Sequence, residues 1–235
     1  MTGKEAHGRV LYGRRLGHRL RAGRRELLQD ALPKFALTLP VGGRLDPDRL
    51  FATPMRACWL EVGFGNGEHL AAQAAAHPDI GCIGCEPFVN GVSMLVQHLV
   101  RQDLKNVRVY PDDARDAFDA LPDACLGRVF VLFPDPWPKT RHHRRRFVSR
   151  ENLDKLARVM MDGAELRLAT DHQDYGRWML HQGLAHPDFE WLAERPGDWR
   201  DRPADDSPTR YEAKAQAAGR PCLYLRFRRR PRGEQ

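Results

Sequence analysis

The stretch that decides the fold is CWLEVGFGNG, residues 58–67, which passes from an apolar run into three closely spaced glycines. The apolar run 58–62 predicts a short buried strand, and the glycines predict a tight turn. An alanine-rich segment, 68–76, follows and stops just before Pro78, which predicts a helix. A strand, a glycine turn and a helix N-terminus in this order predict the nucleotide-binding end of a Rossmann-like α/β fold.

The spacing of the glycines narrows the choice of cofactor. A dinucleotide-binding turn places its third glycine three residues after the second, whereas this chain has Gly63, Gly65 and Gly67. Glu61 stands two residues before the first glycine, where a carboxylate would repel a pyrophosphate but attract a sulfonium or ammonium group. The turn therefore favours S-adenosylmethionine (SAM) over a nicotinamide dinucleotide.

Two further predicted strands end in acidic residues. Residues 80–85 lead to Glu86, at a position where a carboxylate can accept hydrogen bonds from ribose hydroxyls. Residues 107–110 lead to Asp112 and Asp113, one of which can accept from an adenine amino group while the other serves the turn. An alternative interpretation makes Glu86 a helix-start acid, because acids favour the first turn of a helix.

A second informative stretch is VFVLFPDPWPKTRHHRRR, residues 129–146. Its first five residues predict a strand buried on both faces, and the three prolines that follow predict a stiff loop at the end of that strand. Asp135 lies on this loop, at the edge of an α/β sheet where ligands bind. A rigid carboxylate beside a dense cationic segment indicates chemistry on a polyanion.

The rest of the chain continues the alternation of strand and helix. Apolar side chains at helical spacing predict a helix from Leu153 to Met160, and residues 165–170 predict a further strand. Residues 173–184 predict another helix, and residues 222–227 alternate like a strand near the C-terminus. Repeated β-α units closed by a late strand predict a doubly wound α/β sheet.

Composition and charge suggest one core with basic ends. The 235 residues, 42% of them hydrophobic, suffice for one substantial core. The formal charge of +7 is uneven: residues 1–35 carry +6, residues 136–150 carry +6 and residues 220–235 carry +5, so the remainder is acidic. This segregation predicts a phosphate-binding surface, with a merely solvated surface as the alternative. We divide the chain into a basic arm (1–35) that is poorly ordered by itself, a catalytic domain (36–228) and a basic tail (229–235).

Other classes of protein fit the composition poorly. Five scattered cysteines argue against a disulfide framework and indicate a reducing compartment. Cys82 and Cys85 lie within a predicted strand without a second pair at zinc-ligand spacing, so no metal is expected. No apolar run approaches the roughly 20 residues of a membrane span, and the basic N-terminus lacks the apolar core of a secretory signal. We expect a cytoplasmic protein with no membrane contact and no obligatory protein partner.

Four motifs together resemble those of the bacterial tRNA (guanine-N7)-methyltransferases. They are LEVGFGNG (60–67), FPDPWPK (133–139), ATD (169–171) and TRYE (209–212). The resemblance covers roughly residues 10–228. It implies the seven-stranded Rossmann-like sheet of class I SAM-dependent methyltransferases, with a late antiparallel strand. It also implies SAM as cofactor, tRNA as partner, and methyl transfer to N7 of a guanosine in the variable loop.

The resemblance also implies roles for individual residues. It implies that SAM is held by Glu61, Gly63, Gly65, Gly67, Glu86, Asp113 and Asp135. It implies that Asp135 is also the catalytic residue. It implies that the substrate is held by Lys139, Asp171, Thr209, Arg210, Tyr211 and Glu212, and that RNA is contacted by Arg141, His142, His143, Arg144, Arg145 and Arg146. Within the substrate set, Asp171 and Glu212 are our candidates to accept from the N1–H and amino edge of guanine.

Three other hypotheses are compatible with parts of the sequence. An amino-group methyltransferase is suggested because Asp135-Pro136-Trp137 is similar to the (D/N)-P-P-(Y/F/W) loops of such enzymes, although Trp137 takes the place of the second proline. A non-catalytic RNA-binding module would not need an intact glycine turn and four acids placed for a cofactor. An NAD-dependent dehydrogenase fits neither the glycine spacing nor the cationic loop.

Overall fold

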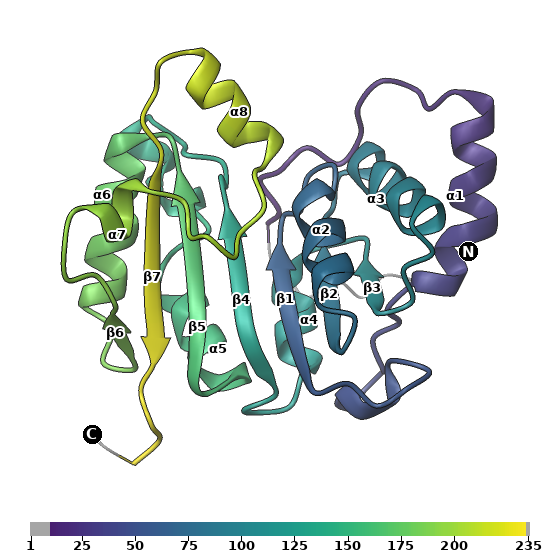
Figure 1. The fold of residues 1–235 in the computed structure, drawn as a ribbon, viewed down its shortest axis with the longest axis horizontal. Helices are drawn as coiled ribbons and strands as arrows, with labels where there is room; N and C mark the ends of the chain where they lie inside the picture. The colour runs from purple at the N-terminus through teal and green to yellow at the C-terminus, as the bar shows by residue number, and fades with distance from the viewer. Residues whose placement is uncertain (1–9, 234–235) are drawn as a thin grey trace.

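The computed structural model describes residues 10–233, so residues 1–9 of the predicted arm and residues 234–235 of the predicted tail lie outside the described range. Seven strands form one sheet in the order β3-β2-β1-β4-β5-β7-β6 (Figure 1). They are β1 (Ala57–Val62), β2 (Ile80–Cys85), β3 (Val107–Tyr110), β4 (Leu126–Leu132), β5 (Met160–Thr170), β6 (Phe189–Trp191) and β7 (Leu223–Arg229). Strands β1 to β5 pair in parallel, and β7 runs antiparallel to both of its neighbours. The seven strands and the late antiparallel strand are as expected.

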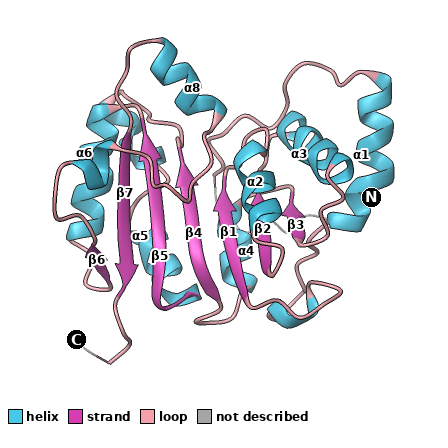
Figure 2. Cartoon of the chain, viewed as in Figure 1, coloured by secondary structure: helices cyan, strands magenta, loops and turns pink. Residues whose placement is uncertain are grey.

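Helices cover both faces of this sheet (Figure 2). They are α1 (Ala22–Phe35), α2 (Glu68–Ala76), α3 (Val89–Arg101), α4 (Ala114–Ala120), α5 (Arg150–Val159), α6 (Gln173–Leu184), α7 (Gly197–Arg200) and α8 (Arg210–Ala217), with 3₁₀ helices η1 (Pro47–Arg49) and η2 (Thr140–Arg145). Apolar side chains of α1, α2 and α3 join one buried cluster, and those of α4, α5 and α6 join another. Two cores on opposite faces make the sheet doubly wound, as predicted.

The N-terminal segment is more ordered than the sequence analysis expected. Residues 22–35 of the predicted arm form helix α1, which packs on α3. Phe35 and Ala31 are buried there, and Leu27, Leu28 and Leu32 pack against the same core. These apolar residues recur at helical spacing, a signal hidden among the arginines. The basic residues of this part of the arm therefore lie on a helix that is packed against the domain.

The carboxyl ends of the central strands are the place for a site. Strand β1 pairs with β2 on one side and with β4 on the other, so the direction of strand addition reverses between β1 and β4. Ligands of open α/β sheets bind at this reversal, outside the carboxyl ends. Helix α8 lies above these ends, next to the segment that precedes α1 (Figure 1). None of the described helices is long and apolar enough to cross a membrane.

Candidate active site

The turn after β1 depends on glycine. Gly63, Gly65 and Gly67 have φ angles of 67°, 58° and 81°, a left-handed region in which a side chain is strained. A Cβ added to Gly91 of α3 would lie 2.1 Å from the carbonyl oxygen of Gly65. Helix α3 therefore touches the turn only because residue 91 is glycine, and the turn is a rigid wall of the site.

Glu86 is fixed against this turn. Its side chain is buried, and its two carboxylate oxygens accept hydrogen bonds from the backbone N–H of Gly65 (2.8 Å) and of Phe88 (2.9 Å). Burial raises the pKa of Glu86 above the usual range of glutamate, while the two N–H groups oppose that rise. The carboxylate is thus oriented beside the turn, as its position after β2 predicts.

Asp113, at the next strand end, is already partnered. It caps α4 by accepting from the backbone N–H of Arg115 (3.0 Å), and the guanidinium of Arg115 binds the same carboxylate through Nε at 3.0 Å. Its neighbour Asp112 forms an ion pair with Arg15 (2.6 Å). Asp113 keeps a place in the wall of the site, with Arg115 beside it.

The proline loop after β4 carries the strained residues of the site. Phe133 and Trp137 have φ angles of 51° and 43°, which are rare for bulky side chains. Between them, Asp135 is open to solvent at the mouth of the site, yet the surrounding protein excludes enough water to raise the pKa of its carboxyl above the usual range. The stiff loop predicted from the prolines is present, and it holds Asp135 away from the core.

These elements enclose a cavity of about 530 Å³. Nine of the residues singled out by sequence line it: Gly63, Gly65, Glu86, Asp113, Asp135, Arg144, Arg145, Arg146 and Tyr211. Others singled out by sequence do not: Glu61, Gly67, Lys139, Arg141, His142, His143, Asp171, Thr209, Arg210 and Glu212. Arg210 instead borders a second, adjoining hollow together with Arg14 and Lys214.

A third wall, which the sequence analysis missed, comes from the segment before α1. Leu11, Tyr12, Gly13 and Arg14 all line the cavity. The segment is tied down where the carbonyl of Arg15 accepts from the N–H of Val89 (3.0 Å), at the start of α3. No sequence motif marks these contacts, because they join parts of the chain more than seventy residues apart.

The TRYE motif builds the start of helix α8. The hydroxyl of Thr209 accepts from the N–H of Glu212 (3.0 Å), and the Glu212 carboxylate accepts from the N–H of Thr209 (3.4 Å), which is a capping box. Glu212 is buried and also accepts from Nε of Arg202 (3.1 Å). Its carboxylate is therefore used inside the protein, and the expected contact with a guanine edge is not what this geometry offers. Tyr211, half exposed, is the residue of the motif that enters the cavity.

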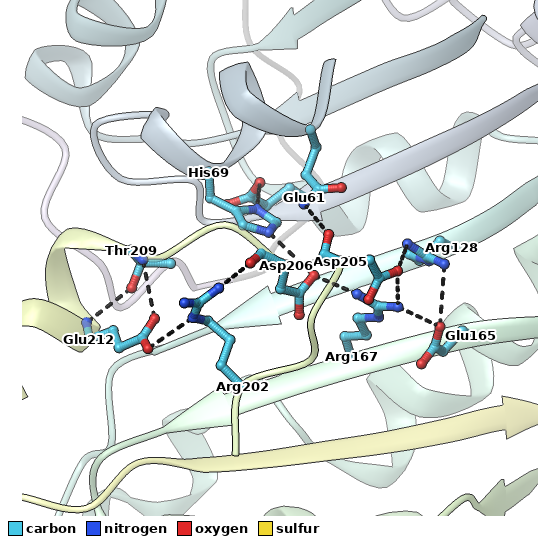
Figure 3. Close-up of polar contacts among 11 residues, drawn as sticks. Glu61, His69, Arg128, Glu165, Arg167, Arg202, Asp205, Asp206, Thr209 and Glu212 are labelled. Carbon is cyan, nitrogen blue, oxygen red and sulfur yellow. Dashed lines mark hydrogen bonds and ion pairs between the residues drawn. The ribbon is translucent and has the colours of Figure 1, made fainter. Parts of the chain in front are cut away.

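A buried polar network anchors this region to the sheet (Figure 3). Nδ1 of His69 lies 2.8 Å from Glu61, and Nε2 lies 3.7 Å from Asp206, a distance that fits an ion pair and not a hydrogen bond. Asp206 also binds Arg167 of β5 (2.5 Å). Glu61 thus points into this network, while its neighbours Val62 and Gly63 reach the cavity. The segment before α8 is held by charges on α2 and β5, and Arg202 continues the network to Glu212.

The cationic loop 139–146 contains two kinds of basic residue. Lys139, Arg141 and Arg144 are exposed and make no ion pair with any residue that the structure describes. The side chain of Arg146 is buried: its Nε donates to the carbonyl of Pro136 (3.0 Å), and its guanidinium pairs with Asp174. Unlike these three residues, Arg146 uses its charge inside the protein to hold the proline loop, so the expected contact of Arg146 with RNA is not supported by this geometry.

The remaining predicted positions have partners of their own. Arg145 stacks between Tyr12 and Trp137, with its guanidinium 4.9 Å from the centre of each ring. His142 and His143 are half-buried, each with its ring against a tryptophan. Asp171 pairs with Arg220 (2.8 Å) outside the cavity.

The basic C-terminal segment is largely neutralised by pairing. Five of its six arginines have carboxylate partners, which are Asp171, Glu165, Glu190, Asp188 and Asp162 for residues 220, 226, 228, 229 and 232. The basic segment that begins at residue 220 is therefore a poor candidate for a phosphate-binding surface. Within residues 10–233, no group of His, Cys, Asp and Glu side chains is arranged to hold a metal ion.

Comparisons with known proteins agree with this geometry. A family model described as "Putative methyltransferase" matches residues 55–225. The tRNA (guanine-N(7)-)-methyltransferase of Rhodospirillum rubrum is 53% identical over 237 residues, covering 99% of this chain and 92% of that protein. The protein of the same name from Jannaschia sp. (strain CCS1) is 47% identical and covers 94% of this chain and 95% of that protein.

Solved structures share the fold at much lower identity. A mutant 16S rRNA (adenine(1408)-N(1))-methyltransferase from Catenulisporales acidiphilia, determined with SAM, has a TM-score of 0.53 and 19% identity, covering 85% of this chain and all of that one. An SAM-dependent O-methyltransferase from Thermotoga maritima has a TM-score of 0.51 and 15% identity, covering 77% of this chain and 62% of that one. The sheet is therefore that of the SAM-dependent methyltransferases.

Proposed function

The chain belongs to the tRNA (guanine-N(7)-)-methyltransferase family, and we propose that it transfers the methyl group of SAM to N7 of a guanosine in the variable loop of tRNA. The observation that carries the proposal is the convergence of the glycine turn, Glu86 and Asp135 on one cavity. This cavity lies at the reversal of the sheet, where such folds bind their ligands. A cytoplasmic site of action follows from a tRNA substrate, and we propose it on that ground.

The residues of the cavity fit SAM. Gly63 and Gly65 present backbone without side chains to the cavity, so a ligand can approach the turn closely there. Glu86 presents a desolvated carboxylate that suits the two ribose hydroxyls, and Asp113 and Arg115 stand at the adjacent strand end, where an adenine would lie. The carboxylates of Glu86 and Asp135 suit a cofactor whose reactive end is cationic. When bound, SAM supplies an electrophilic methyl group on a sulfonium.

The protein's own part in the reaction is positioning and charge. Guanine N7 is a hydrogen-bond acceptor without a proton, so no general base is required to expose its lone pair. Positive charge accumulates on the purine as N7 gains the methyl group. Asp135, held on a stiff loop in a partly desolvated position, would stabilise that charge without moving. Catalysis otherwise comes from holding the base in line with the methyl group.

The tRNA itself would bind across the mouth of the cavity. Lys139, Arg141 and Arg144 are exposed beside it, without carboxylate partners among the described residues, as phosphate contacts require. Arg14, Arg210 and Lys214 border the adjoining hollow and would extend this surface. Phosphate contacts position an RNA without reading its sequence, so the choice of base must come from the cavity.

Product identification tests the proposal. Purified protein, SAM carrying a labelled methyl group and unmodified tRNA should give labelled N7-methylguanosine after digestion to nucleosides and mass spectrometry. Labelled N6-methyladenosine or N2-methylguanosine instead would favour the amino-group alternative suggested by Asp135-Pro136-Trp137. Absence of any labelled nucleoside, with SAM binding retained, would contradict an RNA substrate.

A further inference from the structure

Phe133 stands out because its backbone is strained and its ring joins neither core. Its φ of 51° is unfavourable for a bulky residue, although its N–H still donates to the carbonyl of Ala169 (2.7 Å) as a continuation of the sheet. The strands on either side bury their apolar residues in the two core clusters, but Phe133 belongs to neither and lines the cavity instead. Strain of this kind persists where a side chain must be aimed at a site.

The ring of Tyr211 is the partner of the Phe133 ring. The two ring centroids lie 6.4 Å apart and the planes differ by only 18°. That separation is close to twice the roughly 3.4 Å between successive bases of a nucleic-acid strand. A Cβ on Gly65 would lie 3.3 Å from the Tyr211 ring, so the ring covers the cofactor turn itself.

Several contacts fix the position of Tyr211. It occupies the first turn of α8, which the capping box of Thr209 and Glu212 fixes. Arg202 ties Glu212 to the segment that Asp206 anchors on the sheet (Figure 3). The hydroxyl of Tyr211 is partly shielded from water. Burial raises the pKa of Tyr211 above its usual range, and the nearby charges of Glu86 and Asp135 raise it further. A tyrosine that was only part of the solvated surface would not require a fixed helix start beneath it.

We propose that Phe133 and Tyr211 form an aromatic slot that receives the target guanine and stacks on both of its faces. This proposal rests on the proposed function. It names the side chains that hold the target guanine during methyl transfer. The slot lies next to Asp135 and over the glycine turn, so a base within it is beside the place for the methyl donor. Both rings present an electron-rich face to the purine.

The slot should act on the rate as well as on binding. A purine that gains a methyl group at N7 becomes cationic. An aromatic face attracts a cationic ring more strongly than it attracts a neutral one. The two rings would therefore bind the transition state better than the ground state, which is the condition for lowering the barrier. A ring that served only to pack the loop would affect neither tRNA binding nor turnover once the protein is folded.

The variants can be chosen so that folding does not decide the outcome. Tyr211→Leu removes a half-exposed ring, and Tyr211→Phe retains the ring without its hydroxyl. Phe133→Gly removes the second ring and at the same time relieves the left-handed strain, so its thermal stability should stay near that of the wild type. Trp191→Leu breaks the aromatic pair of Trp191 and Trp199 outside the cavity and serves as the matched control.

The decisive measurement compares two tRNAs that differ only at the target position, one with guanosine and one with an abasic site. Wild-type protein loaded with S-adenosylhomocysteine should bind the guanosine form about 5- to 150-fold more tightly, the range for stacking one base. This preference should be lost in Tyr211→Leu and Phe133→Gly and kept in Tyr211→Phe and Trp191→Leu. The single-turnover rate should fall in the same two variants, with SAM affinity unchanged.

Two results would overturn the slot. One is a wild type that forms N7-methylguanosine yet binds both tRNAs equally; the other is a Tyr211→Leu or Phe133→Gly variant that keeps both the preference and the rate. Failure of the proposed function looks different, because the wild type would then form no N7-methylguanosine at all. That result would remove the target base and overturn both proposals together.

Discussion

Nδ1 of His69 lies 2.8 Å from a carboxylate oxygen of Glu61, and both side chains are buried directly below the glycine turn. On its other side the ring faces Asp206 at 3.7 Å. One imidazole therefore stands between two acids, one from β1 and one from the segment leading to α8. Asp206 already pairs with Arg167 (2.5 Å), so the charged imidazole is above all the counter-charge of the buried Glu61.

The first prediction is that the protein loses stability between neutral and alkaline pH through His69. Burial alone would lower the pKa of His69, but the charges of Glu61 and Asp206 outweigh it and raise the pKa to about 9. The unfolded histidine titrates near 6.5, so the folded state binds the extra proton between these values and stability falls as pH rises through this window. The full contribution, roughly 3 kcal/mol from the shift, is present below pH 6.5.

Urea unfolding at pH 6 and at pH 9.5 measures this effect. The wild type should lose free energy of unfolding across the window, whereas His69→Gln should be less stable at pH 6 and nearly flat. His181→Gln, a change at an exposed histidine of α6, should follow the wild type. Equal pH profiles for the wild type and His69→Gln would mean that His69 is neutral in the folded protein.

The second prediction concerns Asp135. Asp135→Asn should lower the single-turnover rate of methylation by about 100-fold or more, because the charge that develops on the purine loses its counter-charge. Folding should be unaffected, since Asp135 packs in neither core and lies at the mouth of the cavity. Rapid-quench kinetics with saturating tRNA and SAM, beside a thermal melt, separate the two effects. Near-normal turnover would remove the catalytic role.

The third prediction concerns Glu86. Glu86→Ala should weaken SAM binding by roughly 1–3 kcal/mol, since charge-assisted hydrogen bonds to the ribose are lost and the N–H of Gly65 loses its acceptor. Isothermal titration with SAM measures the change. Glu26→Ala, on the exposed side of α1, is the matched loss of one acid. An unchanged dissociation constant for Glu86→Ala would leave it as a helix-start acid only.

The sequence was sufficient for the fold because local rules agree with the tertiary structure there. The strands 80–85 and 107–110 and the helices 68–76 and 173–184 were predicted to the residue, since a glycine or proline stands within three residues of at least one end of each. The position of Glu86 and Asp135 at strand ends also follows from local pattern. The short β6 escaped, because three residues carry too little alternation to be recognised.

The site was harder to predict because partners distant in sequence decide what a charged side chain does. Glu212 reads as a free acid, but the same spacing, Thr209 with an acid three residues on, is also the signature of a capping box. In the sequence, Arg146 cannot be told apart from its neighbours in the cationic run. Only the folded structure brings Asp174 beside it. The contacts of Tyr12 with Arg145 follow no motif at all.

The last prediction separates two kinds of arginine in the cationic loop. Arg141 and Arg144 are exposed without carboxylate partners among the described residues, whereas Arg146 is buried against Pro136 and Asp174. If the first two neutralise phosphates, the double change to alanine should weaken tRNA binding and flatten the slope of log affinity against log salt by roughly 0.7–0.9 per contact. Its melting temperature should stay at the wild-type value.

Arg146→Ala should do the reverse. The loss of its buried hydrogen bond to Pro136 should cost roughly 1–3 kcal/mol of stability, while the salt slope for tRNA should keep its wild-type value. Filter binding across a salt series, combined with urea unfolding of the same samples, tests both variants together. Parallel slopes for the wild type and the double variant would show that the loop does not touch RNA. The phosphate contacts would then have to come from Arg14, Arg210 and Lys214, which border the adjoining hollow.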